Sequence, residues 1–298
     1  MQISGVFPAL VTPYEPSGAV SITALKHNVG LYNRTRVSGY VVLGSTGESV
    51  MLSREESDAI LMAVRESAAS EKVLIAGTGA ESTAETIART KRAADLGYKI
   101  ALVKTPYYYK PVYKPETYLH HYRAVADASP IPILLYSVPQ FTGVSLETPE
   151  ILTLSEHPNI IGIKDSSGVM QRVGEVVGAA RPDFQVLTGG AAVIYSALVV
   201  GARGAILALA SALPEQCTQV FEYVKSGQHE NARELQLKLA HASKCIVSEA
   251  GIAGVKFAMD LRGYKGGLPR LPLLPLKEEK RQEITAIISA LHPAVASV

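Results

Sequence analysis

The chain has 298 residues, of which 47% are hydrophobic and 19% are charged, as expected of a globular protein with a sizeable core. This length suits one large domain or two ordinary ones. The formal net charge of +2, without any run of basic residues, argues against a nucleic-acid partner.

Along the chain, short β-rich segments alternate with longer segments of helical spacing. Helices are predicted to begin at Ser53, which forms a capping box with Glu56, and at Ser82, where Glu85 repeats the signal. A third is predicted to follow Pro115. Eight strands are predicted, at residues 6–13, 39–45, 72–79, 99–107, 132–139, 160–167, 184–190 and 204–210.

This alternation predicts parallel βαβ units, which close either as a (β/α)8 barrel or as a doubly wound sheet. The strand count and the unit length favour the barrel. The doubly wound sheet lacks its usual glycine-rich signal, since GTGAES (77–82) has no third glycine. We therefore expect an α/β barrel over residues 1–212 and a packed C-terminal helical layer over residues 213–298, as one structural unit.

That layer is predicted from helical spacing at residues 214–226, 229–247, 250–261 and 277–291, with a proline-broken connection at 266–276. The amino-terminal segment shows no signal-peptide pattern, and no apolar run is long enough to span a membrane. Two cysteines, Cys217 and Cys245, are too few for a disulfide framework. We therefore expect a cytoplasmic protein without a membrane partner.

Lys164 stands at the end of the strand Ile160–Ile161–Gly162–Ile163, in the sequence NIIGIKDSSG. An ordinary lysine there would extend its ammonium group to water. The carboxyl ends of barrel strands are, however, where barrel enzymes place their active sites. A desolvated lysine at that end would favour the free amine, which can attack a ketone to form a Schiff base.

Other polar residues collect at the same predicted end of the barrel. Tyr136 ends the neighbouring strand, either as a core tyrosine or as a proton relay for Lys164. Ser45 and Thr46 lie in the turn GSTGE, which is either an ordinary turn or a carboxylate site of hydroxyls and backbone N–H groups. Glu48 is interpreted as a helix-start residue rather than a base.

The loop PYYYKP (106–111) carries three tyrosines, of which one is expected to enter the pocket and the others to pack at an interface. Metal chemistry is disfavoured because the seven histidines form no HExxH pattern and the acidic residues show no ligand spacing. A serine hydrolase is disfavoured because no GxSxG elbow is present.

Five motifs, GSTGE, TPYYYKP, YSVP…TG, GIKDSSG and TGG, follow one another at successive strand ends. Their order resembles the class I (Schiff-base) pyruvate aldolase family of dihydrodipicolinate synthase and N-acetylneuraminate lyase, over essentially the whole chain. The resemblance implies a cytoplasmic lyase without metal or organic cofactor, commonly a tetramer built as a dimer of dimers. Its substrates would be pyruvate and an aldehyde.

The resemblance also implies roles for individual residues. Lys164 matches the imine-forming lysine and Tyr136 the tyrosine that acts as acid and base. Tyr108 matches a tyrosine that family members contribute to the proton relay of a neighbouring subunit. Tyr108 is therefore preferred to Tyr107 and Tyr109 as a candidate site residue. The implied pyruvate-binding positions are Ser45 and Thr46 for the carboxylate, with Thr46 also in the relay, Gly189 at a strand end, and Ile206 through its backbone carbonyl.

The branch of the family is indicated by Phe141 in YSVPQFTG. Dihydrodipicolinate synthases usually have an arginine there, and an apolar ring cannot replace a bidentate cation. YSVP…TG, LSEHPNIIGIKDSSG and MDLRGYKGG resemble the 4-hydroxy-2-oxoglutarate aldolase branch more closely. In that branch Ser166 helps to hold the distal carboxylate, although the branch can carry asparagine where this chain has Thr46.

We therefore predict a lyase that cleaves a 4-hydroxy-2-oxo acid to pyruvate and an aldehyde, or joins them, through an imine on Lys164. The alternatives with the same chemistry are dihydrodipicolinate synthase and a sugar-acid or sialic-acid lyase. The alternative from another class is a non-catalytic barrel that senses a 2-oxo acid. The retained Lys164 and Tyr136 argue against a sensor, which needs no imine chemistry.

Overall fold

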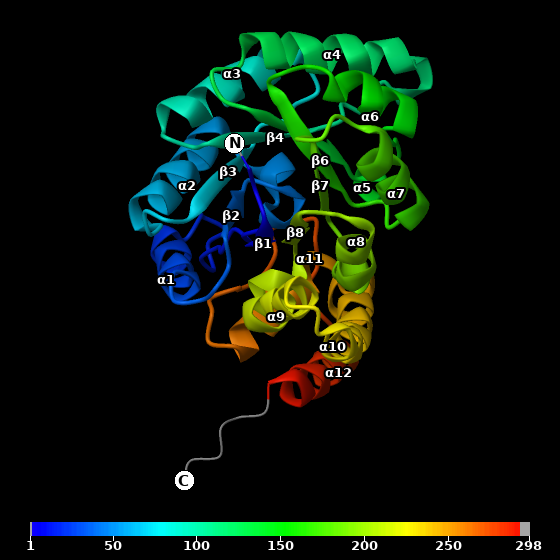
Figure 1. Ribbon diagram of the computed structural model, residues 1–298. Coiled ribbons are helices and arrows are strands. Elements are labelled where there is room, and N and C mark those ends of the chain that lie inside the picture. The colour runs from blue at the N-terminus through cyan, green and yellow to red at the C-terminus, as the bar shows by residue number, and fades with distance from the viewer. Residues whose placement is uncertain (1, 293–298) are drawn as a thin grey trace.

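A computed structural model describes residues 2–292 as a ring of eight parallel strands surrounded by helices (Figure 1). The sheet order is β1-β8-β7-β6-β5-β4-β3-β2, and a bridge between Ala9 and Val41 brings its two ends together. The predicted (β/α)8 barrel is confirmed. The strands are β1 (Gly5–Pro8), β2 (Gly39–Val42), β3 (Val73–Gly77), β4 (Ile100–Lys104), β5 (Ile133–Ser137), β6 (Ile160–Asp165), β7 (Gln185–Thr188) and β8 (Gly204–Leu207).

The helices around the barrel begin where the capping signals predict. Ser53 and Glu56 form the complete capping box, and the Ser82 side chain accepts a hydrogen bond from the Glu85 backbone N–H. Pro115 is the first residue of its helix. These helices are α1 (Ile22–Tyr32), α2 (Arg54–Ser67), α3 (Thr83–Asp95), α4 (Pro115–Ala128), α5 (Pro139–Thr142), α6 (Thr148–Ser155), α7 (Met170–Ala179) and α8 (Ile194–Val200).

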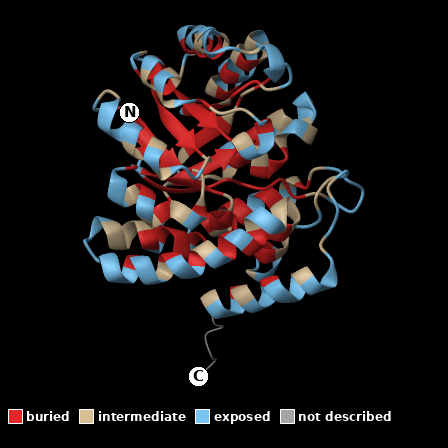
Figure 2. Cartoon of the chain, turned by 90° about the vertical axis from the view of Figure 1, so that its right-hand side faces the viewer, coloured by how far each residue is buried: buried red, intermediate tan, exposed pale blue. Residues whose placement is uncertain are grey.

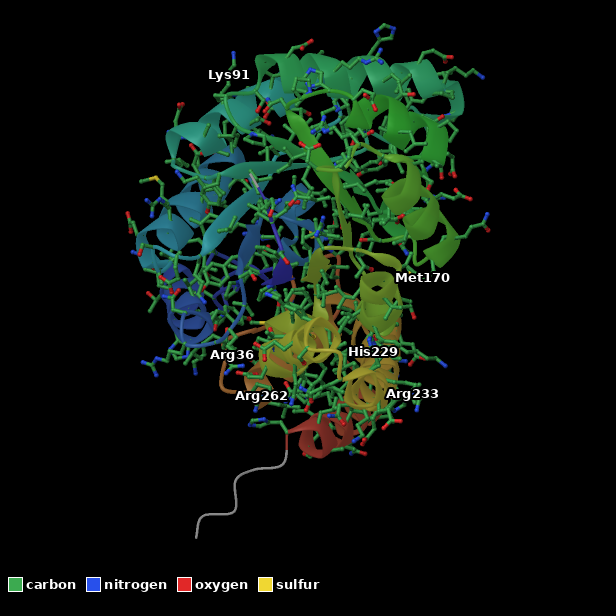
Figure 3. The ribbon with its side chains drawn as sticks, viewed as in Figure 1. Arg36, Lys91, Met170, His229, Arg233 and Arg262 are labelled. Carbon is green, nitrogen blue, oxygen red and sulfur yellow. The ribbon has the colours of Figure 1, made fainter. Side chains whose placement is uncertain are left out.

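The strands are buried on both faces, as Figure 2 shows. Alternate side chains point inward and fill the barrel, among them Phe7, Ile75 and Leu134, while their neighbours pack against the helices. Full burial of one such side chain stabilises the fold by about 1.5–3 kcal/mol. Charged side chains such as Lys91 of α3 lie on the outer face of the helices (Figure 3).

The observed strands are shorter than predicted at their carboxyl ends. The strand predicted at residues 39–45 ends at Val42, because Ser45–Gly47 forms a 3-10 turn, η1. Likewise, the strand predicted at 99–107 ends at Lys104, before the prolines and tyrosines of the next loop. The polar residues that follow the apolar runs are not part of the strands, and they form loops at the carboxyl end of the barrel.

The C-terminal helices are α9 (Pro214–Lys225), α10 (His229–Ala242), α11 (Gly251–Leu261) and α12 (Glu278–Leu291), with the π-helix η6 (Ser243–Glu249) after α10. They lie together beside α8 and β8 (Figure 1) and share one buried cluster with the barrel, to which Val6 and Ile246 both belong. Residues 266–276 contain no helix, as predicted. The last residues of the predicted layer, 293–298, lie outside the described residues.

None of the described helices is long and apolar enough to cross a membrane. Both cysteines, Cys217 and Cys245, are free and buried.

Candidate active site

The turn after β2 brings backbone N–H groups and two hydroxyls to the carboxyl end of the barrel. Ser45 and Thr46 lie in η1, and Thr46 is buried. The Thr12 hydroxyl donates to the Gly47 carbonyl at 2.7 Å and holds the turn from β1's side. Such a turn can bind a carboxylate through its N–H groups and hydroxyls.

Lys164 and Tyr136 meet at the same end of the barrel. They are register partners on β6 and β5, and the Lys164 ammonium nitrogen lies 4.1 Å from the Tyr136 ring centroid. Lys164 is only 4% exposed. The hydroxyl oxygens of Tyr136 and Ser45 are 3.4 Å apart, a long hydrogen bond that joins the tyrosine to the turn. The structure therefore brings Lys164, Tyr136 and Ser45 together.

Gly189, just after β7, provides the space in which Lys164 and Ser166 sit. A Cβ atom on Gly189 would lie 1.8 Å from the Ser166 hydroxyl oxygen and 3.1 Å from Cε of Lys164. The first distance is impossible for real atoms, so a side chain at this position would displace Ser166. The inward-facing Ile206 of β8 packs in the barrel-interior cluster with Tyr136. Gly189 therefore lies beside Lys164 and Ser166, and Ile206 belongs to the same cluster as Tyr136.

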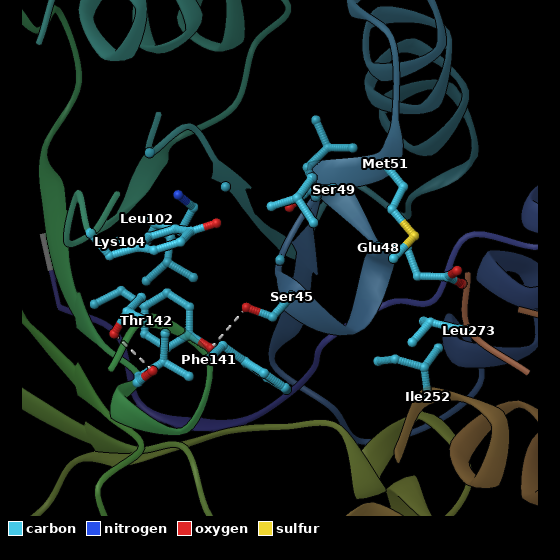
Figure 4. A pocket seen from close by; sticks show the side chains of 18 residues that line it. Ser45, Glu48, Ser49, Met51, Leu102, Lys104, Phe141, Thr142, Ile252 and Leu273 are labelled. Atoms are coloured by element: carbon cyan, nitrogen blue, oxygen red, sulfur yellow. Dashed lines mark hydrogen bonds between the residues drawn. The ribbon is translucent and has the colours of Figure 1, made fainter. Parts of the chain in front are cut away.

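A cavity of about 270 Å³ opens beside Tyr136. Lys104 and Phe141 lie on one side of it, Glu48, Ile252 and Leu273 on the other, and Ser45 between them (Figure 4). Lys164 and Thr46 are not among its lining residues. Tyr136 therefore borders both the cavity and the lysine. Phe141, at the position where arginine is usual in the synthases, is 66% exposed and lines this cavity.

One tyrosine of the loop after β4 faces the cavity, and the next two are exposed. Tyr107 lines the cavity, whereas Tyr108 is 71% exposed and packs edge-on against Tyr109 with ring centroids 5.0 Å apart. Within this chain, the structure does not bring Tyr108 to Lys164. The role implied for Tyr108, in the proton relay of a neighbouring subunit, stays a prediction, because a single chain does not test it.

Glu48 stands before the short 3-10 helix Ser49–Met51, whereas α2 begins only at Arg54. It adopts a left-handed backbone conformation with φ of 55° and is buried next to the turn Ser45–Gly47. Its Oε1 lies 2.6 Å from Nζ of Lys256, whose side chain is completely buried, and its Oε2 accepts the Arg270 backbone N–H at 2.8 Å. Sequence reasoning missed this pair because no local pattern joins residues so far apart.

Lys256 is held by several acceptors. Its ammonium donates to the carbonyls of Thr12 and Leu268 at 2.8 and 3.0 Å, in addition to its pairing with Glu48. Burial lowers the pKa of Lys256, and Glu48 opposes that effect. Arg270 binds Glu56 through two hydrogen bonds, which lower the pKa of Glu56 to about 2. These ion pairs join the C-terminal segment to the residues just after the turn Ser45–Gly47.

Lys104, at the end of β4, lines the cavity, and sequence reasoning missed it. Its Nζ lies 3.3 Å from Oε1 of Glu81 and 4.9 Å from the Tyr107 ring centroid. Burial lowers the pKa of Lys104, and Glu81 opposes that effect. Nearby, burial lowers the pKa of His121 to about 4, so this imidazole is neutral near pH 7. The sequence signal that could have found Lys104 is strand alternation, which places Ile100, Leu102 and Lys104 on the same inward face.

One cluster among residues 2–292 could offer three metal-ligating atoms, from Cys245, Glu249 and Glu283. The Lys280 ammonium already lies 2.8 Å from Glu249 and 2.6 Å from Glu283. Since this ammonium bridges the two carboxylates, the cluster is explained without a metal.

Comparison with known proteins agrees with this geometry. The model of the "Dihydrodipicolinate synthetase family" matches residues 2–291. A 4-hydroxy-tetrahydrodipicolinate synthase of Methanothrix thermoacetophila is 35% identical over 288 residues, which is 96% of each chain. The enzyme of that name from Xanthomonas campestris is 37% identical over 276 residues, covering 93% of this chain and 90% of its own.

Solved structures show the same likeness. Dihydrodipicolinate synthase from Acinetobacter baumannii, described as complexed with pyruvate, superposes with a TM-score of 0.92 at 33% identity. The alignment covers 97% of this chain and 99% of that one. The names of these relatives do not support the narrower expectation of a 4-hydroxy-2-oxoglutarate aldolase branch.

Proposed function

Because the chain belongs to the dihydrodipicolinate synthetase family, we propose that it joins pyruvate to an aldehyde through an imine on Lys164. The observation that carries the proposal is the buried Lys164 ammonium, 4.1 Å from the ring centroid of Tyr136 at the carboxyl end of the barrel. A lysine in that position can become the nucleophile, with a proton-transfer group in contact.

Members of this family act through a pyruvate Schiff base on a lysine and need no external cofactor. The chain is accordingly a pyruvate-dependent enzyme that makes or breaks a carbon–carbon bond. The alternative of a non-catalytic barrel that only senses a 2-oxo acid is therefore set aside.

In the proposed reaction, the Lys164 amine adds to C2 of pyruvate, and loss of water gives the protonated imine. Loss of a C3 proton then gives the enamine, whose C3 attacks the aldehyde carbon while the aldehyde oxygen takes a proton. Water finally hydrolyses the imine, releases the product and restores the amine. The imine nitrogen accepts the electron pair that a metal or an organic cofactor would otherwise have to accept.

We assign the remaining roles from the geometry. Tyr136 moves protons to and from the carbinolamine and the aldehyde oxygen, with Thr46 in the relay and Ser45 joined to Tyr136 at 3.4 Å. Ser45, Thr46 and the N–H groups of their turn hold the pyruvate carboxylate. Gly189 leaves room for the substrate, and Ile206 offers its backbone carbonyl to the site.

The relatives favour aspartate semialdehyde as the second substrate, since they carry the name 4-hydroxy-tetrahydrodipicolinate synthase. Condensation of pyruvate with this semialdehyde is therefore the first candidate reaction.

A second candidate is cleavage of a 4-hydroxy-2-oxo acid such as 4-hydroxy-2-oxoglutarate. It is favoured by Phe141, which lines the cavity where the synthases usually have arginine. Ser166, next to Lys164 across Gly189, would then help to hold the distal carboxylate.

We expect two assays to separate these candidates. Incubation with pyruvate and borohydride, followed by intact mass and peptide mapping, should show a reduced pyruvyl adduct on the peptide that carries Lys164. Consumption of pyruvate with aspartate semialdehyde, compared with cleavage of 4-hydroxy-2-oxoglutarate, then identifies the second substrate. A folded protein that traps no pyruvate would refute the proposed imine and both candidates together.

We also propose that the chain assembles as a dimer of dimers in a reducing cytoplasm. Support comes from the exposed Tyr108 and Tyr109, which follow the cavity-lining Tyr107 and would pack against a second copy, and from the free cysteines. In such an assembly Tyr108 would complete the proton relay of a neighbouring subunit. Sedimentation equilibrium should give four times the chain mass, and cell fractionation should find the protein with cytoplasmic enzymes. A monomer would contradict the assigned role of Tyr108.

A further inference from the structure

Three side chains form a row across the carboxyl edge of the barrel. Lys104 on β4 is the register partner of Tyr136 on β5, and Tyr136 is the register partner of Lys164 on β6. Side chains alternate along a strand, so Lys104 shares the face of Leu102, which packs in the barrel interior. Lys104 therefore belongs to the same inward row as the proposed nucleophile, separated from it by one tyrosine.

Gly79 provides the space in which Lys104 sits. A Cβ atom on Gly79 would lie 2.8 Å from Cγ of Lys104 and 2.5 Å from its backbone nitrogen. The Lys104 side chain is 15% exposed and lines the cavity together with Tyr136 and Phe141. The barrel thus holds a cation at the cavity wall opposite Glu48, as Figure 4 shows.

The hydrogen bond between Lys104 and Glu81 can break without leaving Glu81 unpaired. At 3.3 Å, it is the one hydrogen bond of the Lys104 ammonium to another residue in the described part of the chain, although an ammonium has three donors. Glu81 is held independently, because its Oε2 accepts the backbone N–H groups of Tyr107 and Tyr108 at 2.9 and 2.8 Å. Lys104 can therefore turn toward an anion in the cavity while Glu81 keeps two donors.

We infer that Lys104 determines specificity by binding the carboxylate at the far end of the substrate, the end remote from the imine. The inference rests on the proposed imine at Lys164 and deepens it, because it specifies a dicarboxylate in the adduct. Phe141 lines the same cavity and offers no charge to this group. Both candidate second substrates carry a carboxylate at that end, so the role holds for either reaction.

The test compares two 2-oxo acids that differ only at their far end. 2-Oxoglutarate ends in a carboxylate and 2-oxopentanoate in a methyl group, and each is trapped by borohydride as an imine on Lys164 across a range of concentrations. Wild-type protein should half-saturate at a concentration of 2-oxoglutarate about 10–100-fold lower than that of 2-oxopentanoate, as expected for one charge-assisted hydrogen bond. Lys104→Met should lose this preference, and Lys104→Arg should retain most of it.

Pyruvate is the matched control ligand, because it has no far carboxylate. Its half-saturating concentration should be the same in wild type, Lys104→Met and the second neutral variant, Lys104→Gln. Glu81→Gln should keep the preference for 2-oxoglutarate, since it removes only the competing carboxylate. An unchanged preference in either neutral variant, or equal trapping of the two acids by wild type, would overturn the role of Lys104 alone. Failure of wild type to trap pyruvate would overturn the imine as well.

Discussion

Replacement of Lys164 by alanine is expected to abolish both turnover and borohydride trapping of pyruvate, while the barrel remains folded. Without the amine no imine forms, and no other group supplies its electron-withdrawing nitrogen. We expect activity to fall by on the order of 10⁴-fold or more, as when the nucleophile of other covalent enzymes is removed. Initial rates of pyruvate condensation with aspartate semialdehyde and of 4-hydroxy-2-oxoglutarate cleavage, together with the intact mass after trapping, measure the effect.

Lys91→Ala is the control for this variant, because Lys91 is exposed on α3 and remote from the cavity. It should trap pyruvate as wild type does. Peptide mapping is necessary because Lys104 is a second amine beside the cavity. Turnover retained by Lys164→Ala, with the adduct found on Lys104, would transfer the nucleophilic role to that residue.

Replacement of Lys256 by methionine is expected to lower the free energy of unfolding by about 3–5 kcal/mol, the usual cost of leaving a buried charge without its partner. Glu48 would keep the Arg270 backbone N–H but lose the ammonium 2.6 Å away. The carbonyls of Thr12 and Leu268 would lose a donor as well. Urea unfolding, followed by circular dichroism, measures the change.

The double variant Glu48→Gln with Lys256→Met should recover part of the loss, because it removes the unpaired charge. Lys238→Met is the matched surface control, since Lys238 pairs with Glu234 at 2.8 Å in solvent and should change stability by less than about 1 kcal/mol. A Lys256→Met protein as stable as the Lys238→Met protein would contradict the structural importance of the buried pair.

We propose that the barrel and the C-terminal helices unfold as one unit, since one buried cluster spans both. The number of unfolding transitions in the same urea titration tests this proposal. A single transition in the wild-type protein is expected, and two separated transitions would argue for two independent domains.

Much of the fold could be predicted because its signals are local. Each strand is an apolar run bounded by turn residues, and the helix starts at Ser53 and Ser82 need only the next three residues to be recognised. Lys164 could be singled out because a lysine ending an apolar strand is costly to bury. The positions of Lys164, Tyr136 and Ser45 then follow from the rule that parallel strands end at one edge.

The parts that could not be predicted depend on contacts between distant residues. Glu48 resembled a helix-start residue because its sequence neighbourhood contains hydroxyls and acidic residues, whereas Lys256 and Arg270 determine its environment. Lys104 could not be singled out from the sequence, because a lysine at the end of a strand ordinarily extends its ammonium group to solvent. Its position in the cavity becomes evident only once β4 and β5 are paired in register.

The pairing of Glu48 with the C-terminal segment has a consequence for how the protein is made. Arg270 follows Glu48 by 222 positions, so a ribosome needs on the order of 10–40 s to add the residues between them. All eight strands have been synthesised by Leu207, well before Lys256 and Arg270 are available. A nascent chain therefore has all its strands before the ion pairs beside the turn Ser45–Gly47 can form, and the candidate site is completed only when the C-terminal segment is added.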